Sequence, residues 1–268
     1  MQIGPETRVI LTGASRGIGR ATAELLAGRR CTLGLVARSG EELEALARAL
    51  EGRGANAIPL PADVGDREEM VTAVSRFRET AGGVDVLIAN AGVAYYGLFR
   101  ELPIEEAERM TRVNWLGTVY SVSAALPAML DQGRAWIAIV SSAAGHRAFP
   151  SAAVYGATKF AQRGFLEALR HELAGTAVGV TGVYPAEVKT HLHDEDRAHD
   201  RMPAWYRGDR AIEPSMVAEA IVAGIESERP AVFVPPNARM LGIVHGLSPK
   251  LADRLLRRML GRPAAPAS

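Results

Sequence analysis

The sequence contains a single cysteine, Cys31, among its 268 residues. One cysteine cannot form an intrachain disulfide, and it cannot supply a cluster of thiolates for zinc. A reducing cytoplasm is therefore the expected compartment. Because Cys31 opens a predicted strand, we expect it to be a buried packing residue rather than a reactive thiol.

The sequence also lacks an excess of either charge and lacks a long apolar run. Its 31 basic and 30 acidic residues leave a net charge of +1. Neutralising phosphates requires a basic excess, so nucleic acid is not expected as the main partner. No stretch reaches the roughly 18 apolar residues of a transmembrane helix, and residues 1–6 lack the apolar core of a secretory signal. A soluble protein is expected.

Internal repeats and linkers rich in proline, glycine or serine are absent as well, and short apolar runs alternate with helical patterns. This alternation predicts an α/β fold: one doubly wound, Rossmann-type parallel sheet of about seven strands with helices on both faces. The predicted strands cover residues 8–11, 31–36, 55–60, 84–88, 136–140, 178–183 and 231–234. The predicted helices cover residues 20–27, 41–51, 67–80, 104–130, 154–173 and 215–226.

Two stretches interrupt the alternation, which suggests a main α/β domain over residues 1–237 and a helical extension with a frayed tail over 238–268. The first, about 189–212, is polar and follows a strand end, where a lid over a ligand is expected. Metal ligation by its histidines and aspartates is an alternative, but they show no regular helical spacing. A solvated lid is favoured and no metal site is predicted. The residues concerned are His191, His193, Asp194, Asp196, His199 and Asp200.

A glycine-rich loop, residues 12–19 (TGASRGIG), directly follows the first predicted strand and opens a helix. Glycines at such a junction allow a tight turn and let backbone N–H groups approach a pyrophosphate. The position of Gly13, Gly17 and Gly19 within a strand–helix–strand pattern therefore predicts a dinucleotide site.

The end of the second predicted strand has no acidic residue. A carboxylate there would hold the free ribose hydroxyls of NAD(H), whereas a 2′-phosphate needs a cation. The sequence instead provides Arg38 and Ser39, with Arg16 as a second cation in the glycine loop. Guanidinium groups bind phosphate bidentately, so NADP(H) is favoured over NAD(H).

Tyr155 and Lys159 are four residues apart in a predicted helix and thus lie on one face. A free phenol has a pKa of about 10 and exchanges protons poorly at neutral pH. A nearby ammonium would lower that pKa, as a general acid–base group requires.

Together these motifs resemble the short-chain dehydrogenase/reductase family, up to about Val234. Asn90-Ala91-Gly92 is similar to the family's sheet-stabilising element, and Asp63-Val64 to its adenine-contacting pair. Of Ser141 and Ser142, Ser142 has the family's spacing of 13 residues before Tyr155. Pro185 is followed by Ala186, where the family usually has glycine, so substrate preference is open. The resemblance implies that the cofactor contacts comprise Gly13, Ser15, Arg16, Gly17, Ile18, Gly19, Arg38, Ser39, Asp63, Val64, Asn90, Ala91, Gly92, Tyr155, Lys159, Pro185, Val188 and Thr190.

The resemblance implies hydride transfer between a nicotinamide and a carbonyl or secondary alcohol. Tyr155 would be the general acid–base, Lys159 would lower its pKa and hold the nicotinamide ribose, and Ser142 would hydrogen-bond the substrate oxygen. Asn114 would anchor a water chain. Alternatives are a steroid or fatty-alcohol dehydrogenase working oxidatively and a non-enzymatic NADP(H) sensor, although a sensor does not require all of these residues. The candidate pocket wall suits a lipophilic substrate: Ala94, Tyr95, Tyr96, Ala144, His146, Phe149, Ala186, Trp205 and Tyr206.

The extension places leucines on one helical side and basic residues nearby. Three interpretations compete: packing on another subunit, lying on an anionic membrane, or covering the pocket. Because family members are commonly dimers or tetramers, a homo-oligomer contact is favoured here over the membrane.

Overall fold

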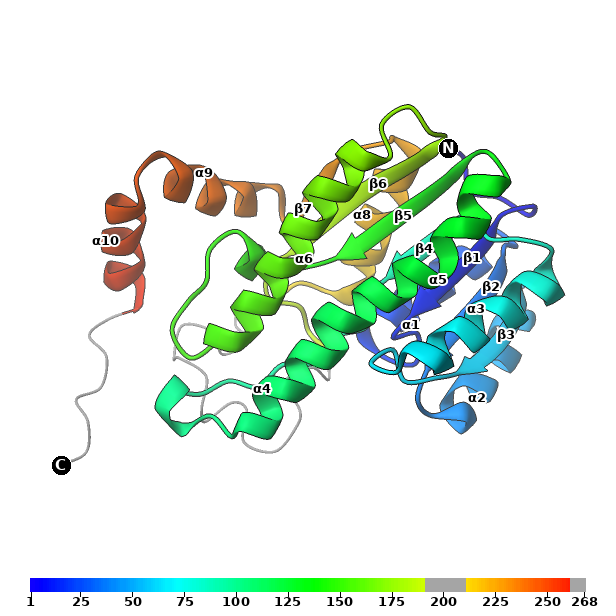
Figure 1. Ribbon diagram of the computed structural model, residues 1–268, viewed down its shortest axis with the longest axis horizontal. Helices are drawn as coiled ribbons and strands as arrows, with labels where there is room; N and C mark the ends of the chain where they lie inside the picture. The colour runs from blue at the N-terminus through cyan, green and yellow to red at the C-terminus, as the bar shows by residue number, and fades with distance from the viewer. Residues whose placement is uncertain (191–210, 261–268) are drawn as a thin grey trace.

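The computed structural model describes residues 1–190 and 211–260. Its centre is a seven-stranded sheet in the order β3-β2-β1-β4-β5-β6-β7, with every neighbouring pair parallel (Figure 1). The predicted doubly wound fold is confirmed. The strands are β1 (Arg8–Thr12), β2 (Thr32–Ala37), β3 (Asn56–Pro61), β4 (Val86–Ala89), β5 (Ala135–Val140), β6 (Val178–Pro185) and β7 (Ala231–Val234).

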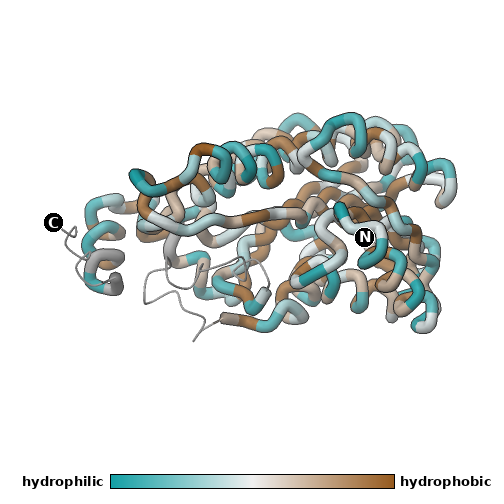
Figure 2. The backbone as a smooth tube through the Cα atoms, turned by 90° about the horizontal axis from the view of Figure 1, so that it is seen from below, coloured by the Kyte–Doolittle hydropathy of each residue, from teal (hydrophilic) through white to brown (hydrophobic). Residues whose placement is uncertain are grey.

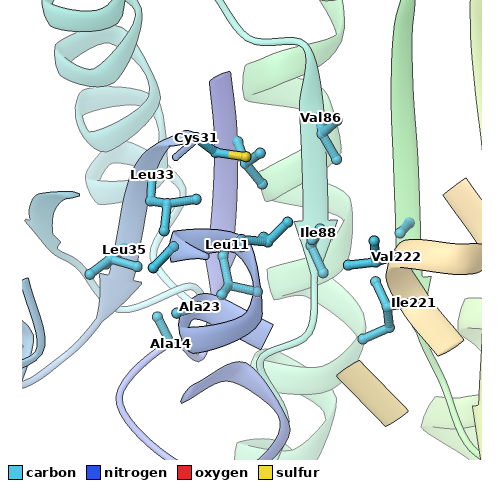
Figure 3. Packing of buried hydrophobic residues seen from close by; sticks show 14 of the residues in the cluster. Leu11, Ala14, Ala23, Cys31, Leu33, Leu35, Val86, Ile88, Ile221 and Val222 are labelled. Atoms are coloured by element: carbon cyan, nitrogen blue, oxygen red, sulfur yellow. The ribbon is translucent and has the colours of Figure 1, made fainter. Parts of the chain in front are cut away.

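Helices cover both faces of the sheet. The first face carries α1 (Gly17–Ala27), α2 (Gly40–Glu51) and α8 (Pro214–Glu226), and the second carries α3 (Arg67–Ala81), α5 (Gly117–Asp131) and α6 (Ala153–Glu172). Alternate strand residues enter the two cores because successive side chains of a strand point to opposite faces. Leu11 belongs to the first core and Ile10 to the second, and both are fully buried. Figure 3 shows the first core, and Figure 2 shows the hydrophobic strands between more hydrophilic helices.

Cys31 lies in the first core, where it is fully buried (Figure 3). Burial raises the pKa of its thiol to about 11, because a thiolate is poorly solvated among apolar side chains. The predicted packing role is confirmed.

The predicted helix 104–130 consists of three parts. α4 (Ile104–Met110) leads into a π-helical turn over Thr111–Leu116, and α5 follows without a gap. A π turn shifts the helical hydrogen bonds by one residue and often occurs at functional sites. Asn114 lies in this turn and is fully buried.

The helical extension is divided into α9 (Arg239–Leu247) and α10 (Pro249–Leu260). The break falls at Ser248, whose backbone is extended, because a residue that precedes proline disfavours helical geometry. The two ends of the predicted lid, 189–212, are hydrogen-bonded to each other: Lys189 N donates to Ile212 O at 2.9 Å. Residues 191–210 and the tail 263–268 lie outside the described residues. In the part of the chain that is described, no helix is long and apolar enough to cross a membrane.

Candidate active site

A cavity of about 370 Å³ opens beyond the carboxyl ends of the strands. Strand order reverses between β1 and β4, and ligands of doubly wound sheets bind beside this switch point. Every predicted cofactor residue except Gly19 lines the cavity, and the predicted catalytic residue Asn114 does not line it. Those that line it are Gly13, Ser15, Arg16, Gly17, Ile18, Arg38, Ser39, Asp63, Val64, Asn90, Ala91, Gly92, Tyr155, Lys159, Pro185, Val188 and Thr190.

The glycine loop is tightly packed between β1 and β4. Gly13 has a φ of +66°, which L side chains rarely adopt, and a Cβ there would lie 2.8 Å from Ala91 Cα. A Cβ on Gly19 would lie only 1.9 Å from the carbonyl oxygen of Gly13. Only glycine fits at these two positions, so the loop packs closely against Asn90 and Ala91 and forms a glycine cradle at the start of α1.

Asn90 fastens the cradle to the sheet. Its Nδ2 donates to Thr12 O at 3.0 Å, and its backbone N donates to Thr12 Oγ1 at 3.0 Å. Ala91 N donates to the same hydroxyl at 3.1 Å. The ends of β1 and β4 are thereby fixed relative to each other, as the resemblance implies for this element.

The cations at the far end of the cavity have an acidic neighbour that the sequence analysis missed. Arg16 and Arg38 both line the cavity, but Arg16 Nη2 forms an ion pair with Glu42 Oε1, and Glu42 also lines the cavity. Ser39 Oγ accepts from Glu42 N at 3.3 Å and so caps α2. This cap places the first turn of α2, and hence Glu42, against the glycine loop.

Tyr155 and Lys159 lie one helical turn apart on α6 and are both buried, with exposed fractions of 6% and 4%. Lys159 Nζ lies 5.7 Å from the centroid of the Tyr155 ring and donates to Val140 O at 3.2 Å. Together they close the inner end of the cavity.

The expected lowering of the Tyr155 pKa is wrong for this environment. Burial raises the pKa of Tyr155 to about 12, although a hydrogen bond with Ser142 opposes the rise. Burial also lowers the pKa of Lys159 from 10.5 to about 7. Desolvation disfavours the charged form of each group, and it is the largest cause of both shifts.

The two adjacent serines have different contacts. Ser141 Oγ donates to Lys159 O at 3.0 Å and so joins the end of β5 to α6. Ser142 Oγ accepts from Ala144 N at 3.1 Å and is hydrogen-bonded to Tyr155. The serine with the family spacing is therefore the one beside the phenol.

Asn114 connects the π turn to two other segments. Its Oδ1 accepts from Val93 N at 2.8 Å, and its Nδ2 donates to Val93 O at 2.9 Å and to Thr158 Oγ1 at 3.1 Å. Its backbone oxygen accepts from Gln162 Nε2 at 2.8 Å and Thr118 Oγ1 at 2.8 Å. These two bonds use both lone pairs of the Asn114 backbone oxygen. The role of Asn114 in anchoring a water chain stays a prediction.

The stretch after β6 closes the side of the cavity. Ala186 N donates to Val234 O at 2.7 Å, which fixes the position where the family usually has glycine. Val188 pairs with Ile212, and a Cβ on Gly17 would lie 3.0 Å from Thr190 Cγ2. Residues after β6 thus lie against the glycine loop.

The predicted apolar wall is only partly at the cavity. Ala94 and Ala186 line it, and the Tyr96 ring lies 5.9 Å from that of Tyr155 and is stacked on Phe149 at 6.3 Å. His146 lies elsewhere: it packs on Tyr184 and Phe233, at 4.4 and 4.9 Å between ring centroids. Burial among these rings lowers its pKa to about 4, so it is neutral near pH 7.

Some predicted positions lie outside the described residues. They include the lid aromatics Trp205 and Tyr206 and the histidines and aspartates considered as metal ligands. Within residues 1–190 and 211–260, no group of three or more histidine, cysteine, aspartate or glutamate side chains could hold a metal ion.

The fold, the glycine cradle and the serine–tyrosine–lysine group together define a nucleotide-dependent oxidoreductase. Sequence comparison agrees, because the profile of the short chain dehydrogenase family matches residues 7–201. The chain belongs to the short-chain dehydrogenase/reductase family.

Three similar proteins illustrate the range of the family. Estradiol 17-beta-dehydrogenase 11 of Mus musculus is 32% identical over 252 residues, 94% of this chain and 83% of that protein. Glycine betaine reductase ATRR of Emericella nidulans is 34% identical over 215 residues, which span 80% of this chain but 17% of that protein. The crystal structure of a short chain dehydrogenase/reductase from Burkholderia phymatum in complex with NAD has a TM-score of 0.87 at 25% identity. That match covers 100% of this chain and 99% of the other.

Proposed function

We propose that this protein is an NADP(H)-dependent oxidoreductase that transfers a hydride between the nicotinamide and a lipophilic carbonyl or secondary alcohol. One observation carries the proposal: Tyr155, Lys159 and Ser142 meet at the inner end of a cavity whose other end is a glycine cradle. A nucleotide-binding protein without catalysis would not require these three groups together.

The cavity fits a nicotinamide dinucleotide. Gly13 and Gly19 let the loop fold tightly at the start of α1, where backbone N–H groups would bind a pyrophosphate. Arg16 and Arg38 line the end where an adenosine 2′-phosphate would bind, which supports NADP(H). The Burkholderia relative was solved with NAD, so the preference rests on these arginines and not on the comparison. When bound, the nicotinamide supplies the site that donates or accepts the hydride.

The protein's own residues then manage the proton and the substrate oxygen. In reduction, the Tyr155 hydroxyl donates its proton to the carbonyl oxygen, and in oxidation it takes the proton from the alcohol. Ser142 orients that hydroxyl and hydrogen-bonds the substrate oxygen as negative charge develops on it. Lys159 contributes positive charge beside the phenol when it is protonated, and Ser141 holds its helix against β5.

The apolar surroundings of Tyr155 support a lipophilic substrate. Ala94 and Ala186 line the cavity, and Tyr96 and Phe149 pack behind the phenol. The similarity to an estradiol dehydrogenase favours the oxidation of a steroid-like or fatty alcohol as the alternative direction. The same acid–base group serves both directions.

Replacing the phenol tests the assignment. Tyr155→Phe removes one oxygen from a buried ring, so we expect unchanged NADPH binding and a loss of turnover of at least about 10²-fold. A panel of ketones, aldehydes and alcohols, followed by NADPH absorbance, measures the turnover. Turnover equal to wild type would refute the assignment, and tight NADPH binding without activity on any compound would favour the sensor.

A further inference from the structure

The helical pair formed by α9 and α10, residues 239–260, carries an unusual share of the exposed apolar surface. Twelve large apolar side chains are exposed in the described part of the chain, and five of them lie on these two helices. They are Met240, Ile243, Leu247, Leu251 and Leu255, with Leu247 82% exposed. The pair projects beyond the carboxyl end of the sheet (Figures 1 and 2). Apolar patches of this kind mark interaction surfaces.

The helical pair is fastened to the body by its other side. Gly242 packs on His146, since a Cβ there would lie 2.9 Å from His146 Nδ1. Arg147 forms an ion pair with Asp253, and Ala252 is buried. Met240, Ile243 and Leu247 share one face of α9, because they are spaced three and four residues apart. The contacts with the body leave this face exposed.

The charges beside the exposed leucines have one sign. Lys250, Arg254 and Arg258 are exposed and lie within one turn of Leu251 or Leu255 along α10. Asp253 is the single acidic residue of α9 and α10, and it is paired with Arg147. An apolar stripe bordered by basic residues is complementary to an apolar layer that has a negative surface.

This charge pattern distinguishes the three interpretations of the extension. A symmetric contact between two copies of the pair would bring the same cations together, which is unfavourable. Covering of the cavity is not supported, because no described residue of 238–260 lines it. We infer that α9 and α10 form an interfacial anchor that binds the protein to an anionic lipid surface, lying in the headgroup region without spanning the bilayer.

Flotation of the full chain with lipid vesicles tests the inference. We expect binding to phosphatidylcholine vesicles that contain about one quarter phosphatidylglycerol, and little binding to pure phosphatidylcholine. Each basic residue near an anionic membrane raises binding about fivefold. Lys250→Glu/Arg254→Glu should therefore lower the partition coefficient at least about 30-fold. Arg53→Glu/Arg76→Glu makes the same change in net charge at exposed positions elsewhere and should lower it far less.

A second pair of variants tests the apolar stripe. Leu251→Ser/Leu255→Ser should weaken binding at least about tenfold, whereas Val71→Ser/Met216→Ser, at exposed positions of α3 and α8, should not. NADPH binding and circular dichroism establish that each variant is folded.

Three results would overturn the inference. The first is no flotation of the wild type with anionic vesicles, and the second is equal losses in the test and control variants. The third is that the wild type does not bind vesicles and the molar mass measured by light scattering is halved in Leu251→Ser/Leu255→Ser. That result would mean that the surface binds a second copy of the chain.

Discussion

The protonation state of Tyr155 sets how the rate of each direction of the proposed reaction depends on pH. Because burial raises its pKa to about 12, the hydroxyl is protonated near pH 7 and is ready to donate to a carbonyl oxygen. Oxidation requires the phenolate, whose fraction rises tenfold per pH unit below the pKa. We therefore expect kcat/KM for alcohol oxidation to rise up to about tenfold per unit between pH 7 and 10, while ketone reduction changes little.

Ser142 provides the control for this pH dependence. Its hydrogen bond lowers the Tyr155 pKa, so Ser142→Ala should shift the rise in oxidation to higher pH. Initial rates with one alcohol and its ketone, measured in overlapping buffers, provide both profiles. A wild-type oxidation rate independent of pH would contradict the role given to Tyr155.

Glu42 should limit the preference for NADP(H). It is paired with Arg16 at the end of the cavity where the 2′-phosphate would bind, so the phosphate must compete with its carboxylate. Glu42→Gln should raise the affinity for NADPH about tenfold and leave that for NADH nearly unchanged. Calorimetric titration with both nucleotides measures the ratio. The exposed neighbour Glu41, changed to Gln, is the matched control. If the ratio of NADPH to NADH affinity is unaltered in Glu42→Gln, the Glu42 carboxylate does not compete with the 2′-phosphate for Arg16.

At the scale of elements, apolar runs predicted the strands well because parallel strands are buried on both faces. β7 has its predicted bounds, whereas β4 begins at Val86 instead of residue 84. The predicted helix 20–27 begins earlier, at Gly17, because a glycine-rich helix start resembles a loop in sequence. Local patterns do not reveal the π turn, which depends on Asn114 bonding to segments distant in sequence.

In the site, too, local motifs predicted some residues, whereas contacts that depend on the tertiary fold were not predicted. Motif spacing predicted that Gly13, Ser142 and Tyr155 belong to one site, and all three line the cavity. Gly13 and Ser142 come just after β1 and β5, and Tyr155 lies on α6 one turn before Lys159. The Arg16–Glu42 pair depends on how α2 approaches the glycine loop, and no spacing rule encodes it. The high pKa of Tyr155 results from the burial contributed by the whole surroundings, which the sequence alone does not give.

The π turn should be a stability element as well as a connector. Asn114→Ala removes three side-chain hydrogen bonds and leaves Val93 N and O without these partners. We expect a loss of about 2–4 kcal/mol in the free energy of unfolding, because unsatisfied buried polar groups are costly. Urea denaturation measures it. The exposed Thr111, changed to Ala, is the control and should lose under about 1 kcal/mol. Equal losses in the two variants would contradict this role.

At the scale of the whole molecule, Lys159 is a group whose burial reduces the stability of the fold. Its pKa falls from 10.5 to about 7 on folding, so folding disfavours its protonated form. Below about pH 7 both states bind the proton and the folded state carries the full cost. Between about 7 and 10.5 the unfolded chain binds more protons, so the free energy of unfolding increases with pH. Above 10.5 the cost is gone.

Replacing this lysine should therefore stabilise the protein while it abolishes activity. We expect Lys159→Met to raise the free energy of unfolding by a few kcal/mol at pH 6.5, since one pKa unit corresponds to about 1.4 kcal/mol. The advantage should shrink towards pH 10, and the lost hydrogen bond to Val140 O reduces it at every pH. Urea denaturation at pH 6.5 and 9.5 measures both values. Lys189→Met, at an exposed position, is the control and should show no such pH-dependent gain. A Lys159→Met advantage that stays constant or grows with pH would mean that Lys159 is not a desolvated cation.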